Sequence, residues 1–231
     1  MRFRPIDFFE NGNYVMTEGA SPTRGIDMEK PGKTTEKILH AARAVFAEKG
    51  YSGTHVDEIA ARAGVNKATL YYQIGDKDTL YAHVIHQVLG NIAGVLAEDV
   101  GKATHPAEKL KTYINGIAAA VDKNPELPSI MMREMAGGGA HLPRVVIEDI
   151  AGVLAILQGI LEDGRKKGIF EAVSPFLIHM MIMGTILFYK KGAGIQDQPS
   201  RLAEALRVRD RKLKGHLGNE VGKLVFRAIR K

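Results

Sequence analysis

From Thr34 onward, apolar residues recur three and four positions apart, and this helical spacing continues through most of the chain. The first such segment runs to Gly50 and places Ile38, Val45 and Phe46 on one face. No segment of convincing length alternates apolar and polar residues as a half-buried strand does, and the sequence has no internal repeat. The pattern therefore predicts an all-α protein.

The composition is that of a folded chain with no thiol chemistry. The 231 residues are 45% hydrophobic and 25% charged, which are ordinary values for one or two globular domains. The absence of cysteine excludes disulfides, thiolate catalysis, zinc fingers and iron–sulfur clusters. The histidines form no spaced cluster with carboxylates, so no metal and no cofactor is predicted. The N-terminal sequence MRFRPIDFFENGNYVM contains acids and no apolar run, so no secretory leader is predicted and a cytoplasmic location is expected.

Short helical segments follow the first one. Thr54 and Asp57 resemble a capping box, with Asp in place of the usual Glu, and would open a short helix that a glycine ends. Asn66 is predicted to cap the next helix, Lys67 to Gln73, across a tight AGVN turn. Asp76 is predicted to cap a long fourth helix. Three short helices with this turn are the outline of a helix-turn-helix.

The seven-residue helix within this outline is predicted to have one buried face and one face exposed at the surface. A helix so short is not stable alone, so Leu70 and Ile74 must pack on their neighbours. The opposite face of the helix is then free to enter the major groove of DNA.

The stretch GYSGTHVDEIAARAGVNKATLYYQIGDKDTL resembles the N-terminal DNA-binding domain of the TetR family of transcriptional regulators. The family typically shows a glycine and a threonine close together, then IA, AGV and TLYYHF, followed by a lysine and a leucine. The matching residues are Gly50, Thr54, Ile59, Ala60, Ala63, Gly64, Val65, Thr69, Leu70, Tyr71, Tyr72, Lys77 and Leu80. Two positions depart from the pattern, since Gln73 stands where His or Tyr is common and Ile74 replaces an aromatic residue.

The resemblance implies a ligand-responsive repressor that binds a palindromic operator in double-stranded DNA as a homodimer. It implies that Lys67 and Ala68 begin the recognition helix and face base edges, and that Tyr71 contacts a base methyl group or a phosphate. The residues implied to hold the phosphate backbone are Thr54, Thr69, Tyr72, Gln73 and Lys77. Helix N-termini favour phosphate independently of any family.

The resemblance also implies the domain organisation. Residues 1–32, rich in glycine and proline, are predicted to be a flexible arm, 33–93 the DNA-binding domain, and 94–231 a helical bundle for ligand binding and dimerisation. In the family, the helix at 175–191 and one near the C-terminus form a four-helix bundle across the dimer axis. The apolar stripe predicted for the C-terminal helix consists of Leu217, Val221, Leu224, Val225 and Ile229.

Two clusters of methionine suggest an adaptable hydrophobic pocket, because Met is flexible and polarisable. The predicted effector-binding residues are Tyr113, Met131, Met132, Met135, His179, Met180 and Met183, with Arg133 as a further polar candidate. Ordinary core filling is the alternative for every one of them, and no particular effector is identified by the sequence.

The net charge of +6 originates in the C-terminal tail, where residues 201–231 carry ten basic and three acidic side chains. This tail is either a second DNA contact or a solvated helix face. We favour the solvated face, because in the resembling family the C-terminal half lies far from the DNA and charges are screened over about 8 Å.

Two other classes of protein remain as alternatives. An all-α enzyme would need a catalytic motif, and neither G-x-x-x-x-G-K-[ST] nor G-x-S-x-G occurs. A membrane-associated helical protein would rest on the uncharged residues 172–189. Because Pro175 interrupts that stretch, we predict a buried bundle helix and no membrane partner.

Overall fold

A computed structural model describes residues 32–196, 213 and 216–231. These residues leave out 1–31 of the predicted arm and, in the basic tail, 201–212 and 214–215, which include Arg207, Arg209 and Arg211. Within the described part, the regular structure is helical, and the β-type pairing there is one isolated antiparallel bridge between Phe170 and Arg230. The prediction of an all-α protein is confirmed.

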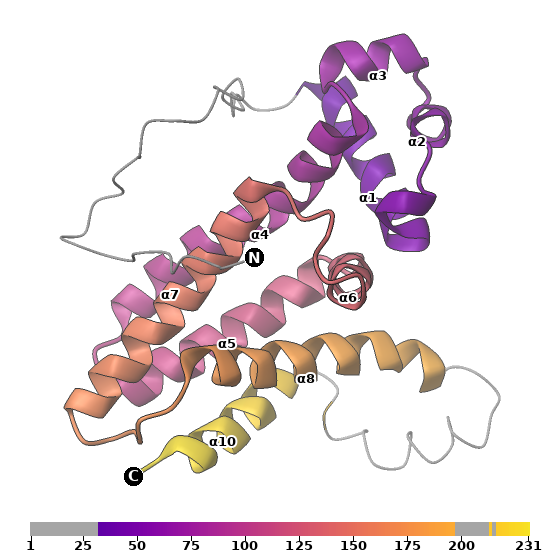
Figure 1. Ribbon diagram of the computed structural model, residues 1–231. Helices are drawn as coiled ribbons and strands as arrows, with labels where there is room; N and C mark the ends of the chain where they lie inside the picture. The colour runs from indigo at the N-terminus through magenta and orange to yellow at the C-terminus, as the bar shows by residue number, and fades with distance from the viewer. Residues whose placement is uncertain (1–31, 197–212, 214–215) are drawn as a thin grey trace, which may run out of the picture. The chain divides into compact units, whose positions relative to one another are not determined.

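The N-terminal helices form a small head (Figure 1). They are α1 (Lys33–Gly53), α2 (Val56–Ala63) and α3 (Lys67–Gln73), which pack on one another, and α1 also packs on α4 (Lys77–Lys102). The side chains that hold the head together are fully buried, and they include Ile38, Ala42, Val45, Phe46, Ile59, Leu70 and Leu80. Their spacing places one apolar face of each short helix against the same small core.

Three of the predicted helix ends are confirmed. The carboxamide of Asn66 accepts a hydrogen bond of 2.7 Å from the backbone N–H of Thr69. The carboxylate of Asp76 accepts one of 2.8 Å from the N–H of Thr79. Gly64 ends α2 in the left-handed conformation, with φ 68°. Each of these satisfies backbone groups that a helix end leaves unpaired.

The predicted capping box at the start of α2 is wrong. The hydroxyl of Thr54 is buried and donates a hydrogen bond of 2.6 Å to the carbonyl oxygen of Gly50. The residue before α2 is His55, whose side chain makes no capping hydrogen bond. Gly50, with φ 72°, kinks α1 and brings its carbonyl within reach of the threonine. Thr54 therefore fastens the corner between α1 and α2, and the carboxylate of Asp57 pairs with Lys67 instead.

The remaining helices form the regulatory half. They are α5 (Pro106–Lys123), α6 (Leu127–Ala136), α7 (Arg144–Lys166), α8 (Pro175–Gln196) and α10 (Leu217–Ile229). Helix α4 passes from the head into this half and packs against both α5 and α7, so the predicted boundary at 93–94 falls inside one continuous helix (Figure 1).

The apolar stripe of α10 faces its own subunit. Leu217, Val221, Val225 and Ile229 are buried, and of the five predicted stripe residues only Leu224 is exposed. Helix α10 lies close to α5, since a Cβ added to Gly218 would sit 2.6 Å from Oδ1 of Asn115. The expectation that this stripe packs across a dimer axis is therefore corrected, because four of its members already pack inside the chain.

Within the described residues, α4 has the length and hydropathy to cross a bilayer by composition alone, with a mean hydropathy of 1.3 over a window of 18 residues. Its apolar residues pack against α5 and α7, which is what a core helix of a bundle does. The uncharged residues 172–189, which the sequence analysis considered as a membrane segment, also contribute to the core. In their helix α8, the buried side chains are Ile178, Ile182, Ile186 and Leu187.

Candidate nucleic-acid interface and effector site

Helix α3 presents a continuous exposed face. Leu70 is fully buried and Ile74 is half-buried, which anchors one side of the helix to the head. The other side is open to solvent, and Tyr72 is 87% exposed. The predicted interface residues on this exposed surface are Lys67, Ala68, Tyr71, Tyr72 and Gln73. Thr69 is half-buried at the helix start. The structure thus gathers six of the eight predicted DNA-binding residues on one short helix.

Gln73 is held by the first helix of the head. The hydroxyl of Thr35 donates a hydrogen bond of 3.1 Å to Oε1 of Gln73. With its oxygen engaged in this way, the amide nitrogen of Gln73 retains two donors. This arrangement suits contact with a phosphate, which only accepts hydrogen bonds.

The other two predicted residues are placed differently. Thr54 is 2% exposed and its hydroxyl is already used, so it is not part of the exposed surface. The ammonium group of Lys77 lies 4.4 Å from the ring centroid of Tyr51, in a cation–π arrangement. Burial lowers the pKa of Lys77 from its ordinary value. Lys77 is therefore partly enclosed at the start of α4.

Behind the head lies a buried carboxylate that the sequence did not predict. Glu134 of α6 is 4% exposed and accepts a hydrogen bond of 2.7 Å from the hydroxyl of Tyr81 in α4. It also accepts one of 3.3 Å from the backbone N–H of His141. Burial, followed by this hydrogen bond to a carboxylate, raises the pKa of Tyr81. The ring of His141 stacks on Tyr51 with centroids 4.5 Å apart.

Arg133 belongs to the same junction between the head and α6. Its guanidinium donates a hydrogen bond of 2.7 Å to the carbonyl oxygen of Glu48 in α1. Gly50 leaves room for it, because a Cβ there would lie 3.2 Å from Cδ of Arg133. Arg133, considered in the sequence as a ligand contact, instead ties α6 to the head.

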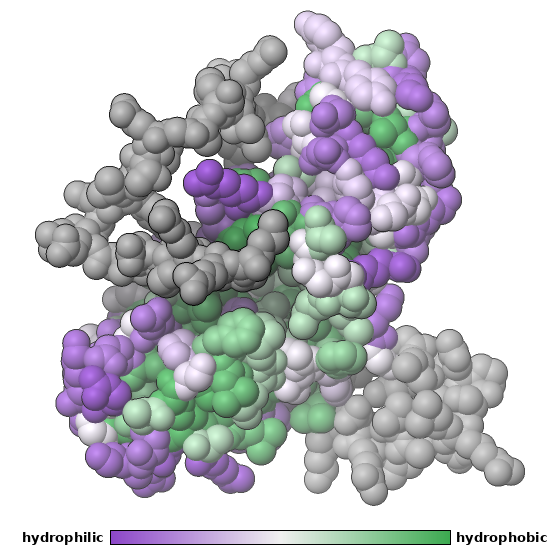
Figure 2. All heavy atoms as spheres, viewed as in Figure 1, coloured by the Kyte–Doolittle hydropathy of each residue, from purple (hydrophilic) through white to green (hydrophobic). Residues whose placement is uncertain are grey.

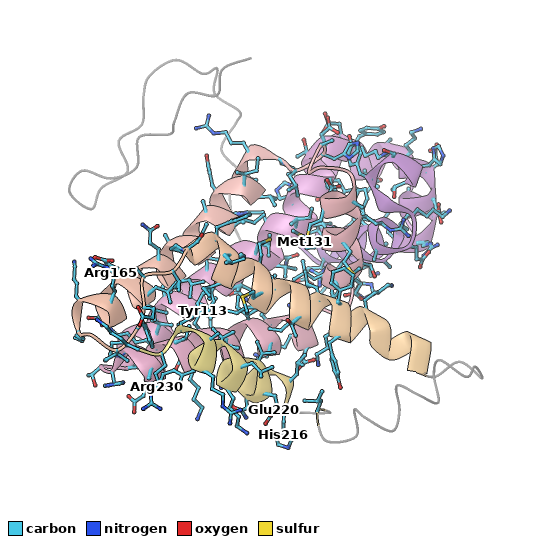
Figure 3. The ribbon with its side chains drawn as sticks, turned by 60° about the horizontal axis from the view of Figure 1, so that its bottom comes forward. Tyr113, Met131, Arg165, His216, Glu220 and Arg230 are labelled. Atoms are coloured by element: carbon cyan, nitrogen blue, oxygen red, sulfur yellow. The ribbon has the colours of Figure 1, made fainter. Side chains whose placement is uncertain are left out.

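A buried polar pair lies in the core of the regulatory half. The hydroxyl of Tyr113 in α5 and Nδ1 of His179 in α8 are 2.9 Å apart, and both residues are almost completely buried. Burial lowers the pKa of His179 and raises that of Tyr113. The pair is therefore neutral near pH 7, as expected where solvation of charge is lost. Figure 3 shows Tyr113 among the helices of the regulatory half.

The predicted methionines do not all join this pair. Met131 is buried, whereas Met132, Met180 and Met183 are half-buried. Met135 is 53% exposed near the end of α6. Two surface hollows of about 480 and 440 Å³ lie beside α7 and between α5 and α10, and none of the predicted effector residues lines either.

The fold and the exposed α3 define a helix-turn-helix protein with a helical regulatory half, and comparison with known proteins agrees. The chain matches the family model described as "Bacterial regulatory proteins, tetR family" over residues 38–84. It matches "Tetracyclin repressor-like, C-terminal domain" over residues 106–193. Together these cover more than half of the chain. The protein therefore belongs to the TetR family and is a DNA-binding transcriptional regulator.

Individual relatives are similar over most of their length. The fatty acid metabolism regulator protein of Bacillus subtilis is 30% identical over 151 residues, covering 65% of this chain and 78% of the relative. The regulator RutR of Escherichia coli is 27% identical, covering 75% and 82%. A crystal structure of FadR from Bacillus subtilis in complex with stearoyl-CoA has a TM-score of 0.63 at 27% identity, covering 83% of this chain and 97% of that one.

Proposed function

We propose that this protein is a dimeric repressor whose residues 33–93 bind a palindromic operator and whose residues 94–231 dimerise and bind an effector. The observation that carries the proposal is the exposed face of α3, a helix stabilised by its buried side while its polar side stays in solvent. A surface of this kind fits the major groove, and one such head per chain calls for two chains on a two-fold operator.

Within this proposal, the residues have separate tasks. Lys67 and Ala68, at the start of α3, face base edges, and Tyr71 contacts a base methyl group or a phosphate. The residues proposed to bind phosphates are Thr69, Tyr72, Gln73 and Lys77. Base contacts choose the sequence, whereas phosphate contacts supply affinity and salt dependence. Thr54 is left out because its side chain is buried.

The test of this function is binding-site selection with the purified protein, followed by one substitution. Lys67→Ala should lower operator affinity by about 1–3 kcal/mol and relax the preference at one base pair of each half-site. Titrations against operator variants at that position would measure both effects. Equal loss of affinity for every DNA sequence would contradict a base-reading role for Lys67.

Dimerisation is proposed through α8, whose outward face is apolar. The exposed large apolar side chains described on this helix are Phe176, Leu177, Met181 and Phe188, and Leu224 is exposed on the neighbouring α10. Figure 2 shows hydrophobic residues gathered over the part of the molecule where α8 begins and α10 runs, while the head is mostly hydrophilic. Exposed apolar surface of this kind marks an interaction site, and a second copy of the chain is the occupant that a two-fold operator requires.

The effector is proposed to be a largely apolar molecule with a neutral hydrogen-bonding group that meets Tyr113 and His179. Because that pair carries no charge, it suits an ester or thioester carbonyl better than a carboxylate. The FadR structure was determined with stearoyl-CoA. The acyl chain and the thioester carbonyl of that molecule match this description, whereas its CoA part carries charged phosphates. Met131, Met132, Met180 and Met183 would adapt around an acyl chain.

The effector proposal predicts a stabilised protein. Stearoyl-CoA at 100 times its dissociation constant should raise the free energy of unfolding by about 2.7 kcal/mol, because it binds the folded state alone. It should also weaken operator binding, because an effector of a repressor binds the conformer that does not fit the operator more tightly. Thermal denaturation with stearoyl-CoA, and with free CoA as the control, would measure the stabilisation. An equal response to both compounds would assign the effect to the nucleotide and contradict a site at Tyr113.

We also propose that the protein has no catalytic activity and acts in the cytoplasm, where bacterial operators lie. Both proposals rest on its relatives, which are named as transcriptional regulators. An enzyme remains the alternative function, and a gel-shift assay separates the two.

A further inference from the structure

Asp57 and Lys67 are brought together by the turn between α2 and α3. Asp57 lies in the first turn of α2 and Lys67 is the first residue of α3. Both carboxylate oxygens of Asp57 lie 3.0 Å from the ammonium nitrogen of Lys67. The side chains are 69% and 51% exposed, respectively, so the pair lies on the surface of the head.

The pair is not accounted for by stability. An ion pair between exposed side chains contributes about 0–1 kcal/mol, because water and salt screen it and two long side chains lose freedom. Asp57 also has no capping task, since Thr54 turns its hydroxyl to Gly50 and α2 starts without a side-chain cap. A carboxylate beside the recognition helix is moreover unfavourable next to DNA phosphates. A carboxylate in the first turn of α2 gives that helix a modest stabilisation, and its position beside the recognition helix points to a role in binding as well.

We infer that Asp57 is a positioning residue that sets the DNA sequence specificity of Lys67. This inference rests on the proposed base-reading role of Lys67. A lysine ammonium has three donors on a flexible stem, so it binds any phosphate within reach. With Oδ2 of Asp57 accepting a hydrogen bond from it and Oδ1 also 3.0 Å away, the ammonium is held near the start of α3 and keeps its other donors for a base edge. Asp57 thereby suppresses phosphate binding by Lys67 on non-operator DNA and preserves its contact on the operator.

The inference predicts unequal changes on operator and non-operator DNA. Asp57→Asn should raise affinity for non-operator DNA about threefold to tenfold, because the freed Lys67 neutralises one more phosphate. The slope of log affinity against log salt on that DNA should steepen by about one unit. The ratio of operator to non-operator affinity should fall at least about threefold. Asp57→Glu keeps the carboxylate and should restore most of the ratio.

Three controls separate this positioning role from a general effect of charge or of stability. Glu98→Gln removes the same charge from an exposed pair with Lys102, at the distal end of α4, and should leave both affinities unchanged. The melting temperature of Asp57→Asn should stay close to that of the parent, whereas a large drop would indicate a structural role. In a Lys67→Ala background, Asp57→Asn should no longer steepen the salt slope on non-operator DNA.

The outcomes distinguish this inference from the proposed function. An unchanged affinity ratio in Lys67→Ala would show that Lys67 does not read a base, and the proposed function of that residue would fail. If Lys67→Ala lowers the ratio but Asp57→Asn changes neither the ratio nor the salt slope, the inference about Asp57 is overturned while the role of Lys67 stands.

Discussion

Phe188→Arg should convert the dimer into a monomer and lower operator affinity at least about a hundredfold, since a single head retains little more than non-specific binding. Phe188 lies on the outward face of α8 and is 65% exposed. In the proposed dimer it is buried against the partner, where an unpaired guanidinium would lose its solvation. Sedimentation of the variant and titration against a full operator would measure the two effects together.

The same substitution should leave the isolated chain folded, because a side chain as exposed as Phe188 contributes little to the core of its own subunit. Ile147→Arg on α7 is the matched control, with 53% exposure outside α8. It should retain the dimer. A Phe188→Arg variant that sediments as a dimer and binds the operator normally would show that α8 is not the interface.

Gly164→Ala should reduce the free energy of unfolding by about 3 kcal/mol or more, which is at the upper end of overpacking effects. A Cβ at this position would lie 2.0 Å from Cδ2 of Phe170, whose ring is buried. Neither group has room to move, because Phe170 follows the end of α7, packs edge-on against Phe226 and pairs with Arg230. Chemical denaturation of the variant would measure the loss.

Gly159→Ala in the same helix is the control with the opposite sign. No atom lies within 4 Å of a Cβ added there, so the residue meets only solvent. Alanine has the higher helix propensity, and the substitution should stabilise the protein by about 0.5–1 kcal/mol. If both variants lost stability equally, the packing of Phe170 against α7 would not be the cause.

The helix ends and apolar faces were predicted correctly because they depend on residues close together in the sequence. Asn66 and Asp76 cap their helices because each competes only for backbone groups a few residues away, and Gly64 supplies a conformation that other residues adopt with strain. The apolar faces of the head follow directly from helical spacing, so the exposed side of α3 could be predicted as well.

The features that the sequence did not predict depend on contacts between distant segments or on a kink in the backbone. Tyr81 and Glu134 are 53 positions apart, and nothing local in either segment indicates that their side chains meet. The positive φ angles of Gly138 and Gly139, which follow α6, bring the backbone N–H of His141 back to Glu134, and the sequence does not predict this turn. Thr54 was misassigned because its competing acceptor, the carbonyl of Gly50, depends on a kink that the spacing did not predict.

The continuity of α4 has a mechanical consequence. Its 26 residues span about 39 Å at 1.5 Å per residue, with the head at one end and the packing against α5 and α7 along the rest. A rigid rod of this length converts a tilt of about 5° into a displacement of about 3 Å at its tip, which is close to one base-pair step of DNA. In a dimer that must match half-sites about 34–36 Å apart, so small a rotation moves each recognition helix out of register with its bases. A change too slight to disturb the core is therefore large enough to release an operator.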